Sequence, residues 1–74
     1  MMSNSFNLLD VVALTEDLPA HGLCRGQVGT IVEELAPGVF EVEFSDSTGR
    51  PYAMAPVKVV QLLALHYEPT EVAS

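Results

Sequence analysis

The clearest pattern of apolar and polar positions along the chain lies in the hexapeptide VFEVEF, which spans residues 39–44. Apolar and acidic residues alternate here with a period of two, which is typical of a strand buried on one side. The pattern predicts that Phe40, Val42 and Phe44 point into a core. The two glutamates between them are expected to face water.

Four other short segments are predicted to be strands: 8–14, 26–35, 50–57 and 61–65. The first of these is apolar on both faces, which predicts a buried strand, with a short helical turn as the alternative. Gly26 and Gly29 predict a bulge or a sharp bend in the second. Pro51 and Pro56 lack N–H donors, so they are expected at strand ends or on a sheet edge.

Turn residues separate these segments. A long loop with a proline and a glycine covers 15–22, Pro37-Gly38 and the stretch 46–49 predict tight hairpins, and a single turn is expected at 57–60. Five short strands are too few for a typical sandwich, which has about seven. The sequence therefore predicts an all-β fold, a small five-stranded SH3-like barrel, because a closed barrel removes exposed sheet edges.

The expected organisation is a flexible N-terminal segment over 1–7, a barrel domain over 8–65 and a polar C-terminal tail over 66–74.

The single cysteine, Cys24, excludes an internal disulfide and favours a reducing compartment. We expect its side chain to be buried or half-buried. The first residues show no export signal, and the apolar runs are too short to cross a bilayer, so the expected location is cytoplasmic.

The charge of the 74-residue chain limits its partners. Ten acidic residues against three basic ones give a net charge of −7. Nucleic acid and anionic membrane surfaces are bound mainly through Lys and Arg, so neither is an expected partner. A basic protein is the partner that this charge favours. Because 49% of the residues are hydrophobic, a face covered by a second copy, as in a homodimer, is the alternative.

No pattern of catalytic, metal-binding or cofactor-binding residues appears in the sequence. His21 and His66 are far apart and have no cysteine pair nearby, unlike ordinary zinc ligands. We therefore predict that the protein is not an enzyme and uses no cofactor or metal. The candidate residues for binding a partner are Glu41, Glu43, Asp46 and Tyr52.

Each of these candidates also has a simpler interpretation. Glu41 and Glu43 lie on one strand face with Asp46 just beyond, which suits either a solvated surface or an acidic docking patch. Tyr52 can form an aromatic peptide groove or pack against the core.

Several motifs together resemble a known family. They are LLDVVAL at 8–14, DLP at 17–19, RGQVGTIVE at 25–33 and EVEF at 41–44, followed by Asp46, Gly49 and Arg50. In these motifs the chain resembles the bacterial domain of unknown function 4926 family from about Leu8 to Leu65. The stretch 26–32 is also similar to the core of KOW-type SH3-like barrels, which implies the fold but not their RNA-binding roles, because Glu33 and Glu34 stand where basic residues would be needed.

The resemblance implies a small protein that binds another protein, with an immunity or antitoxin-like role as one form. The alternative is a structural accessory subunit that stabilises a larger assembly through an apolar face.

Overall fold

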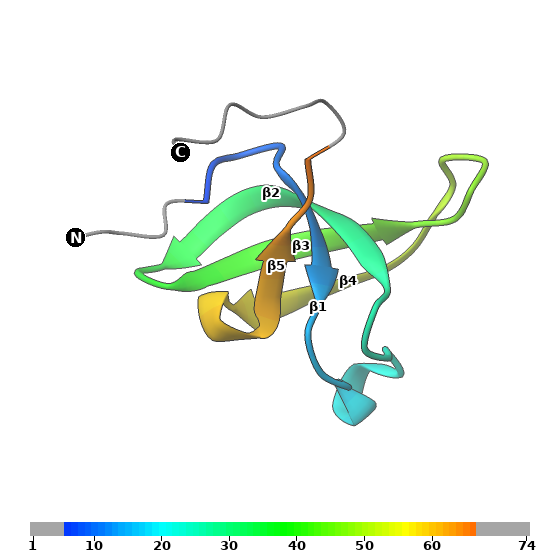
Figure 1. Ribbon diagram of the computed structural model, residues 1–74, viewed down its shortest axis with the longest axis horizontal. Helices are drawn as coiled ribbons and strands as arrows, with labels where there is room; N and C mark the ends of the chain where they lie inside the picture. The colour runs from blue at the N-terminus through cyan, green and yellow to red at the C-terminus, as the bar shows by residue number, and fades with distance from the viewer. Residues whose placement is uncertain (1–5, 67–74) are drawn as a thin grey trace, which may run out of the picture.

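A computed structural model describes residues 6–66 of the chain, which form one antiparallel sheet of five strands (Figure 1). The strands and the two 3-10 turns are β1 (Val11–Leu14), η1 (Pro19–His21), β2 (Val28–Ala36), β3 (Val39–Ser45), β4 (Pro51–Lys58), η2 (Val59–Gln61) and β5 (Leu62–Ala64). The all-β prediction is confirmed, since these residues contain no α-helix.

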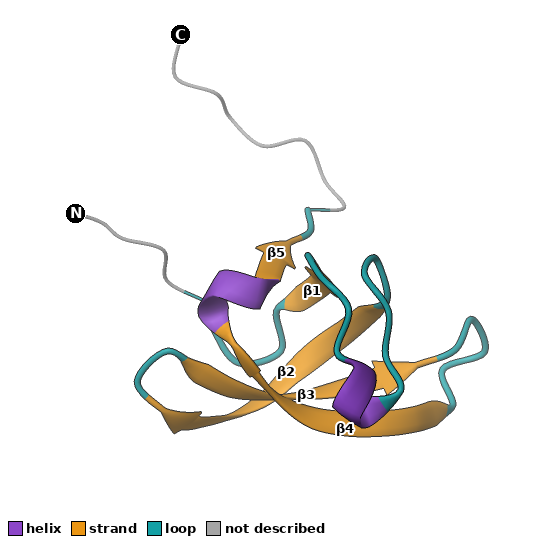
Figure 2. Cartoon of the chain, turned by 90° about the horizontal axis from the view of Figure 1, so that it is seen from below, coloured by secondary structure: helices purple, strands orange, loops and turns teal. Residues whose placement is uncertain are grey.

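The order of strands across the sheet is β4-β3-β2-β1-β5. Strand β2 is the longest and pairs with β1 through its first residues and with β3 from Gly29 to Ala36. Figure 2 shows the resulting curved sheet, with β1 and β5 on one side and the β2–β3–β4 hairpins on the other. Strands β4 and β5 are the two edges of the sheet, and no ladder joins them within residues 6–66.

The inner face of the curved sheet holds the hydrophobic core. Alternation on β3 is as predicted, because Phe40, Val42 and Phe44 are all buried. The complete set of buried hydrophobic residues is Val12, Leu14, Leu23, Ile31, Phe40, Val42, Phe44, Ala55, Val57 and Leu62. Every strand contributes to this core, so the fold depends on all five.

The first predicted strand is shorter than expected. Leu8 and Leu9 lie in a turn and are exposed, and Leu9 adopts a left-handed backbone conformation with φ of 72°. Strand β1 begins only at Val11 and alternates between half-buried and buried residues, whereas the sequence predicted burial on both faces. The turn depends on hydrogen bonds between Leu9 or Asp10 and Ile31 of β2. These partners are distant in sequence, so the local run of apolar residues could not predict the turn.

The bulges of β2 also lie elsewhere than predicted. Gly26 is in the turn before the strand, with φ of 91°, as a sharp bend requires. Gly29, in contrast, pairs regularly with Phe44. A Cβ atom at Gly29 would come within 2.6 Å of Val42 Cγ1 and 2.8 Å of the Glu43 carbonyl oxygen, so this glycine allows a close approach of β2 and β3 rather than a bulge.

The prolines of β4 fit the prediction, because β4 is an edge strand. The predicted segment 1–7, apart from its last two residues, and the predicted tail after His66 lie outside the described residues. Neither η1 nor η2, the helical segments within 6–66, is long and apolar enough to span a membrane.

Candidate functional site

Two of the predicted partner-binding residues share the outer face of β3. Glu41 and Glu43 are half-buried, and their side chains point away from the core because their neighbours on β3 point into it. In the register of the sheet, Glu41 lies opposite Glu33 of β2. Glu43 lies opposite Thr30. The acidic face is defined here as Glu33, Glu41 and Glu43.

The pairing of Glu33 with Glu41 is the unusual feature of this face. Directly opposed residues of an antiparallel pair have Cβ atoms about 4.5–5.5 Å apart, and like charges at that separation destabilise the sheet. On the other flank of β3, the partners of Glu41 and Glu43 are uncharged, namely Pro56 and Met54 of β4. No cation therefore lies directly opposite Glu41 or Glu43, and the nearest basic residue of β4 in the register is Lys58, opposite Val39.

Asp46 has a different setting, at the start of the hairpin that joins β3 to β4. Its Oδ1 atom accepts hydrogen bonds from the Thr48 hydroxyl at 2.7 Å, the Thr48 backbone N–H at 2.9 Å and the Arg50 backbone N–H at 3.0 Å. Gly49, with φ of 86°, completes the turn and donates its N–H to the Asp46 carbonyl at 2.9 Å. One carboxylate oxygen thus organises the whole hairpin.

These hydrogen bonds lower the pKa of Asp46 below its ordinary value of 3.8, the Thr48 hydroxyl having the largest effect and the two backbone N–H groups adding to it. All three donors favour the charged form of the carboxyl. The other carboxylate oxygen, Oδ2, has no hydrogen bond to the described residues. It is the atom of Asp46 that a partner could contact.

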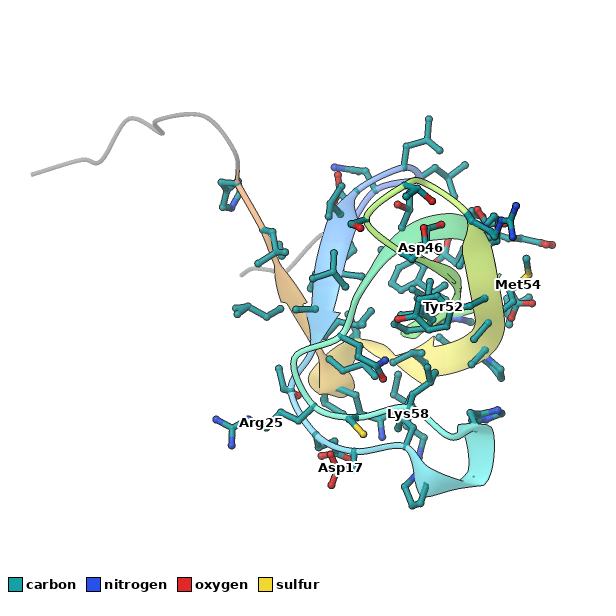
Figure 3. All side chains as sticks on the ribbon, turned by 90° about the vertical axis from the view of Figure 1, so that its right-hand side faces the viewer. Asp17, Arg25, Asp46, Tyr52, Met54 and Lys58 are labelled. Carbon is teal, nitrogen blue, oxygen red and sulfur yellow. The ribbon has the colours of Figure 1, made fainter. Side chains whose placement is uncertain are left out.

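Tyr52 occupies a bulge at the start of β4. Ser45 pairs with Pro51 and Phe44 with Ala53, so Tyr52 is the extra residue between them. Figure 3 shows the aromatic side chain of Tyr52 on the inside of the curved sheet, whereas Met54 points outward. The Gln27 side-chain amide donates to the Tyr52 hydroxyl at 3.2 Å, and the side chain is 49% exposed. Tyr52 therefore covers one end of the curved sheet.

The structure thus brings Glu41 and Glu43 together. It places Asp46 in the hairpin after β3 and the Tyr52 ring on the inner side of the curved sheet (Figure 3). It adds Glu33, whose position the sequence analysis did not predict. Simple alternation would put Glu33 and Glu34 on opposite faces, but a bulge at Val32 shifts the register so that Glu33 faces Glu41. No local sequence signal marks this bulge, because Val32 is the extra residue only by its lack of a partner on β3.

The other potential metal ligands among the described residues do not gather into a site. Cys24 is exposed, contrary to the prediction that it is buried or half-buried. It lies in the loop before β2, where its backbone N–H donates to the Gln27 side-chain oxygen. Among the side chains of residues 6–66, no three His, Cys, Asp or Glu residues gather in a way that could hold a metal ion.

Comparison with known proteins gives a family. The family described as "Domain of unknown function (DUF4926)" matches residues 8–64. The chain belongs to the DUF4926 family. This confirms the resemblance noted in the sequence, and the DUF4926 region contains all five strands and the acidic face. No curated protein and no solved structure matches the chain.

Proposed function

We propose that this DUF4926 protein is a non-enzymatic protein–protein interaction module that binds a basic surface through its acidic face. The observation that carries the proposal is the direct opposition of Glu33 and Glu41 across β2 and β3. Like charges held opposite each other cost stability in the free protein. A cationic group from a partner, placed between them, would relieve that cost and gain two charge-assisted hydrogen bonds.

The net charge of −7 extends this preference beyond direct contacts. Summed negative charge attracts a basic partner over a distance and raises the rate of encounter. In this proposal Asp46 contributes through its Oδ2 atom at the margin of the interface, and Tyr52, which is 49% exposed, contributes at the end of the curved sheet.

We propose, as the finer description of the fold, that the curved sheet is an SH3-like barrel. Three features support it. They are the strand order β4-β3-β2-β1-β5, the two bulges in the part of β2 beyond its pairing with β1, and the η2 turn that connects β4 to β5. An NMR structure with side-chain contacts between β4 and β5 across the core would support closure. Contacts confined to neighbouring strands would instead indicate an open sheet.

The proposed biological role is that of an immunity or antitoxin-like protein in the bacterial cytoplasm, covering a basic site on its target. A small acidic protein is suited to this role because it can mimic a polyanionic ligand in size and charge. The immunity or antitoxin-like role is what the resemblance to the DUF4926 family implies, and the net charge of −7 and the acidic face suit it.

The test begins with capture of partners on immobilised protein from native lysate, at about 0.1 M and about 1 M salt, between which the Debye length falls from roughly 10 Å to 3 Å. The expected result is retention of a basic protein at low salt and its release at high salt. The association rate of that purified protein is then measured with the variant Glu41→Gln/Glu43→Gln. We expect a rate reduced on the order of tenfold.

The matched control is Glu16→Gln/Asp17→Asn, which changes the net charge equally but in the loop after β1. Both replacements keep an oxygen that can accept the present hydrogen bonds, from Gln61 to residue 16 and from the Arg25 N–H to residue 17. An equal loss of rate in control and test variants would show that only overall charge matters. A complex that resists high salt and tolerates the β3 variant would refute binding by the acidic face.

A second candidate function is that of an accessory subunit that docks through an apolar face. Ala13 of β1 pairs with Val28 of β2 on one side and with Leu63 of β5 on the other. In-register partners point to the same side of a sheet, so these three side chains form an outward apolar row. Leu63 is 57% exposed and Val28 is 40% exposed, an arrangement that also suits a homodimer.

Sedimentation velocity over a range of concentrations tests this second candidate. Self-association that persists at high salt and is abolished by Leu63→Ser would support it, because apolar contacts are little affected by screening. A monomer at all concentrations, with partner capture unchanged by Leu63→Ser, would refute it.

A further inference from the structure

A pocket lies at the end of the sheet where the chain enters β1, next to the acidic face. It has a volume of about 330 Å³, at the lower end of the range of about 300–1,000 Å³ for small-molecule pockets. This size suits one inserted side chain better than a larger ligand. Its lining consists of four apolar residues, two acidic residues and one amide, namely Phe6, Leu8, Val32, Phe40, Glu33, Glu34 and Asn7. It is called the Phe6 pocket below.

The wall of the Phe6 pocket on the N-terminal side is fixed by hydrogen bonds to β2. The Leu9 N–H donates to the Ile31 carbonyl at 2.7 Å, and the Ile31 N–H donates to the Asp10 carbonyl at 3.0 Å. The Asp10 side chain also accepts the Asn7 N–H at 2.8 Å. These bonds hold the turn that carries Leu8, so the pocket is formed before any ligand arrives, which lowers the entropy cost of binding.

Aromatic rings form part of the pocket surface. Phe6 and Phe40 meet edge to face, with ring centroids 6.1 Å apart and an angle of 61° between their planes. Phe40 is buried in the core, whereas Phe6 is half-buried. Leu8, which is 60% exposed, adds an apolar wall open to solvent. This surface favours a long aliphatic or planar group over a small polar one.

The charge of the pocket comes from two consecutive residues of β2. Glu33 and Glu34 are both exposed and both line it, although neighbouring residues of a regular strand point to opposite faces. Glu34 pairs with the inward-facing Phe40 and Glu33 with the outward-facing Glu41, so Glu34 borders the pocket on the Phe40 side and Glu33 borders it on the outer side of the strand. Glu33 also faces Glu41, so it links the pocket to the acidic face.

We infer that the Phe6 pocket receives an arginine side chain of the basic partner, an inference that rests on the proposed function. Charge complementarity selects a cation, and the apolar lining selects one with a long stem and a weakly hydrated head. Arginine combines both properties. Its planar guanidinium stacks on aromatic rings and forms two parallel hydrogen bonds to a carboxylate, whereas the lysine ammonium is compact and strongly hydrated. Buried arginine anchors are also frequent hot spots of interfaces.

The test is an NMR titration of the ¹⁵N-labelled full chain with N-acetyl-arginine amide. N-acetyl-citrulline amide, which has nearly the same shape without the charge, serves as the control probe. We expect saturable shifts of the amides of Leu8, Glu33 and Glu34 with the arginine probe only. The variant Glu33→Gln/Glu34→Gln should weaken binding about tenfold or more, because it replaces charged hydrogen-bond acceptors with neutral ones.

Glu16→Gln/Asp17→Asn, with the same change of net charge, should bind the arginine probe as the natural protein does. Equal shifts with citrulline, or binding unaffected by the Glu33→Gln/Glu34→Gln variant, would overturn the inference. N-acetyl-lysine amide binding as tightly as the arginine probe would overturn the assignment to arginine.

If the probe does not bind but a basic partner still depends on Glu41 and Glu43, the pocket is refuted and the proposed function stands. If the probe binds but no basic partner exists, the proposed function is refuted.

Discussion

One oxygen of Asp46 accepts three hydrogen bonds inside the hairpin that this residue begins. At the scale of the single residue, Asp46 therefore stabilises the hairpin, and this role does not depend on what its second carboxylate oxygen contacts. A substitution of Asp46 will therefore change the hairpin as well as the surface charge. Effects of such a variant on partner binding have to be compared with its effects on stability.

The pKa of Asp46 gives a prediction about pH. Because the folded-state pKa lies below the ordinary 3.8, the stabilisation is complete above about pH 3.8 and is lost as the pH falls through the folded-state pKa. In Asp46→Asn the acceptor oxygen remains but the charge is absent. We expect the difference in unfolding free energy between the natural protein and Asp46→Asn to be constant near neutral pH and to shrink below about 3.8. Urea denaturation at a series of pH values measures it, and a difference independent of pH would contradict the prediction.

A second prediction at this scale concerns Gly29, where a Cβ atom has no room. Gly29→Ala forces β2 away from β3 and should destabilise the fold by about 1–3 kcal/mol, the usual cost of overpacking. Gly38→Ala is the control, since Gly38 has open space around it and a positive φ of 77°. The two costs have different origins, so Gly29→Ala should cost less in a Val42→Ala background than in the natural protein, whereas Gly38→Ala should cost the same in both. The relief is partial, because the Glu43 carbonyl oxygen still lies within 2.8 Å of the added Cβ. Thermal unfolding of the natural protein, the three single variants and the two double variants measures this, and equal costs of Gly29→Ala in both backgrounds would contradict the close-packing interpretation.

At the scale of the element, the strands differ in how far their sequences predict them. Strand β3 and its two hairpins were predictable because period-two alternation and turn residues are local properties. The sequence did not locate the two bulges of β2. Val32 and Leu35 are extra residues only because they have no pairing partner on β3, which is a property of the sheet register. For the same reason Glu41 and Glu43 were found as candidates, whereas Glu33 and the Phe6 pocket depend on register and on the turn before β1.

The pairing of β2 with β3 leads to the third prediction. Glu33→Lys places opposite charges across from each other and should stabilise the free protein by about 0.2–1 kcal/mol. Glu34→Lys is the control, because it makes the same change of net charge but faces Phe40. Chemical denaturation at low and high salt should show a gain specific to Glu33→Lys that decreases as salt screens the charges. An equal gain in both variants would mean that only overall charge matters.

At the scale of the whole molecule, the two edges of the sheet are protected differently. Edge strand β4 contains Pro51 and Pro56, which lack N–H donors and discourage another strand from pairing there. Edge strand β5 has only three residues, so it offers little length for pairing. A partner is therefore expected to recognise side chains on the faces of the sheet, where the acidic face and the apolar row lie, rather than to extend the sheet.

The pairing of β5 with β1 has a consequence for the making of the protein. Strands β2, β3 and β4 are joined by short hairpins and can pair soon after synthesis, but one flank of β1 has to wait for β5. A nascent chain that ends before Leu62 leaves that flank open and lacks one residue of the core. Because unpaired strand edges promote aggregation, the interval between the emergence of β4 and β5 from the ribosome is when this chain is most in need of a chaperone.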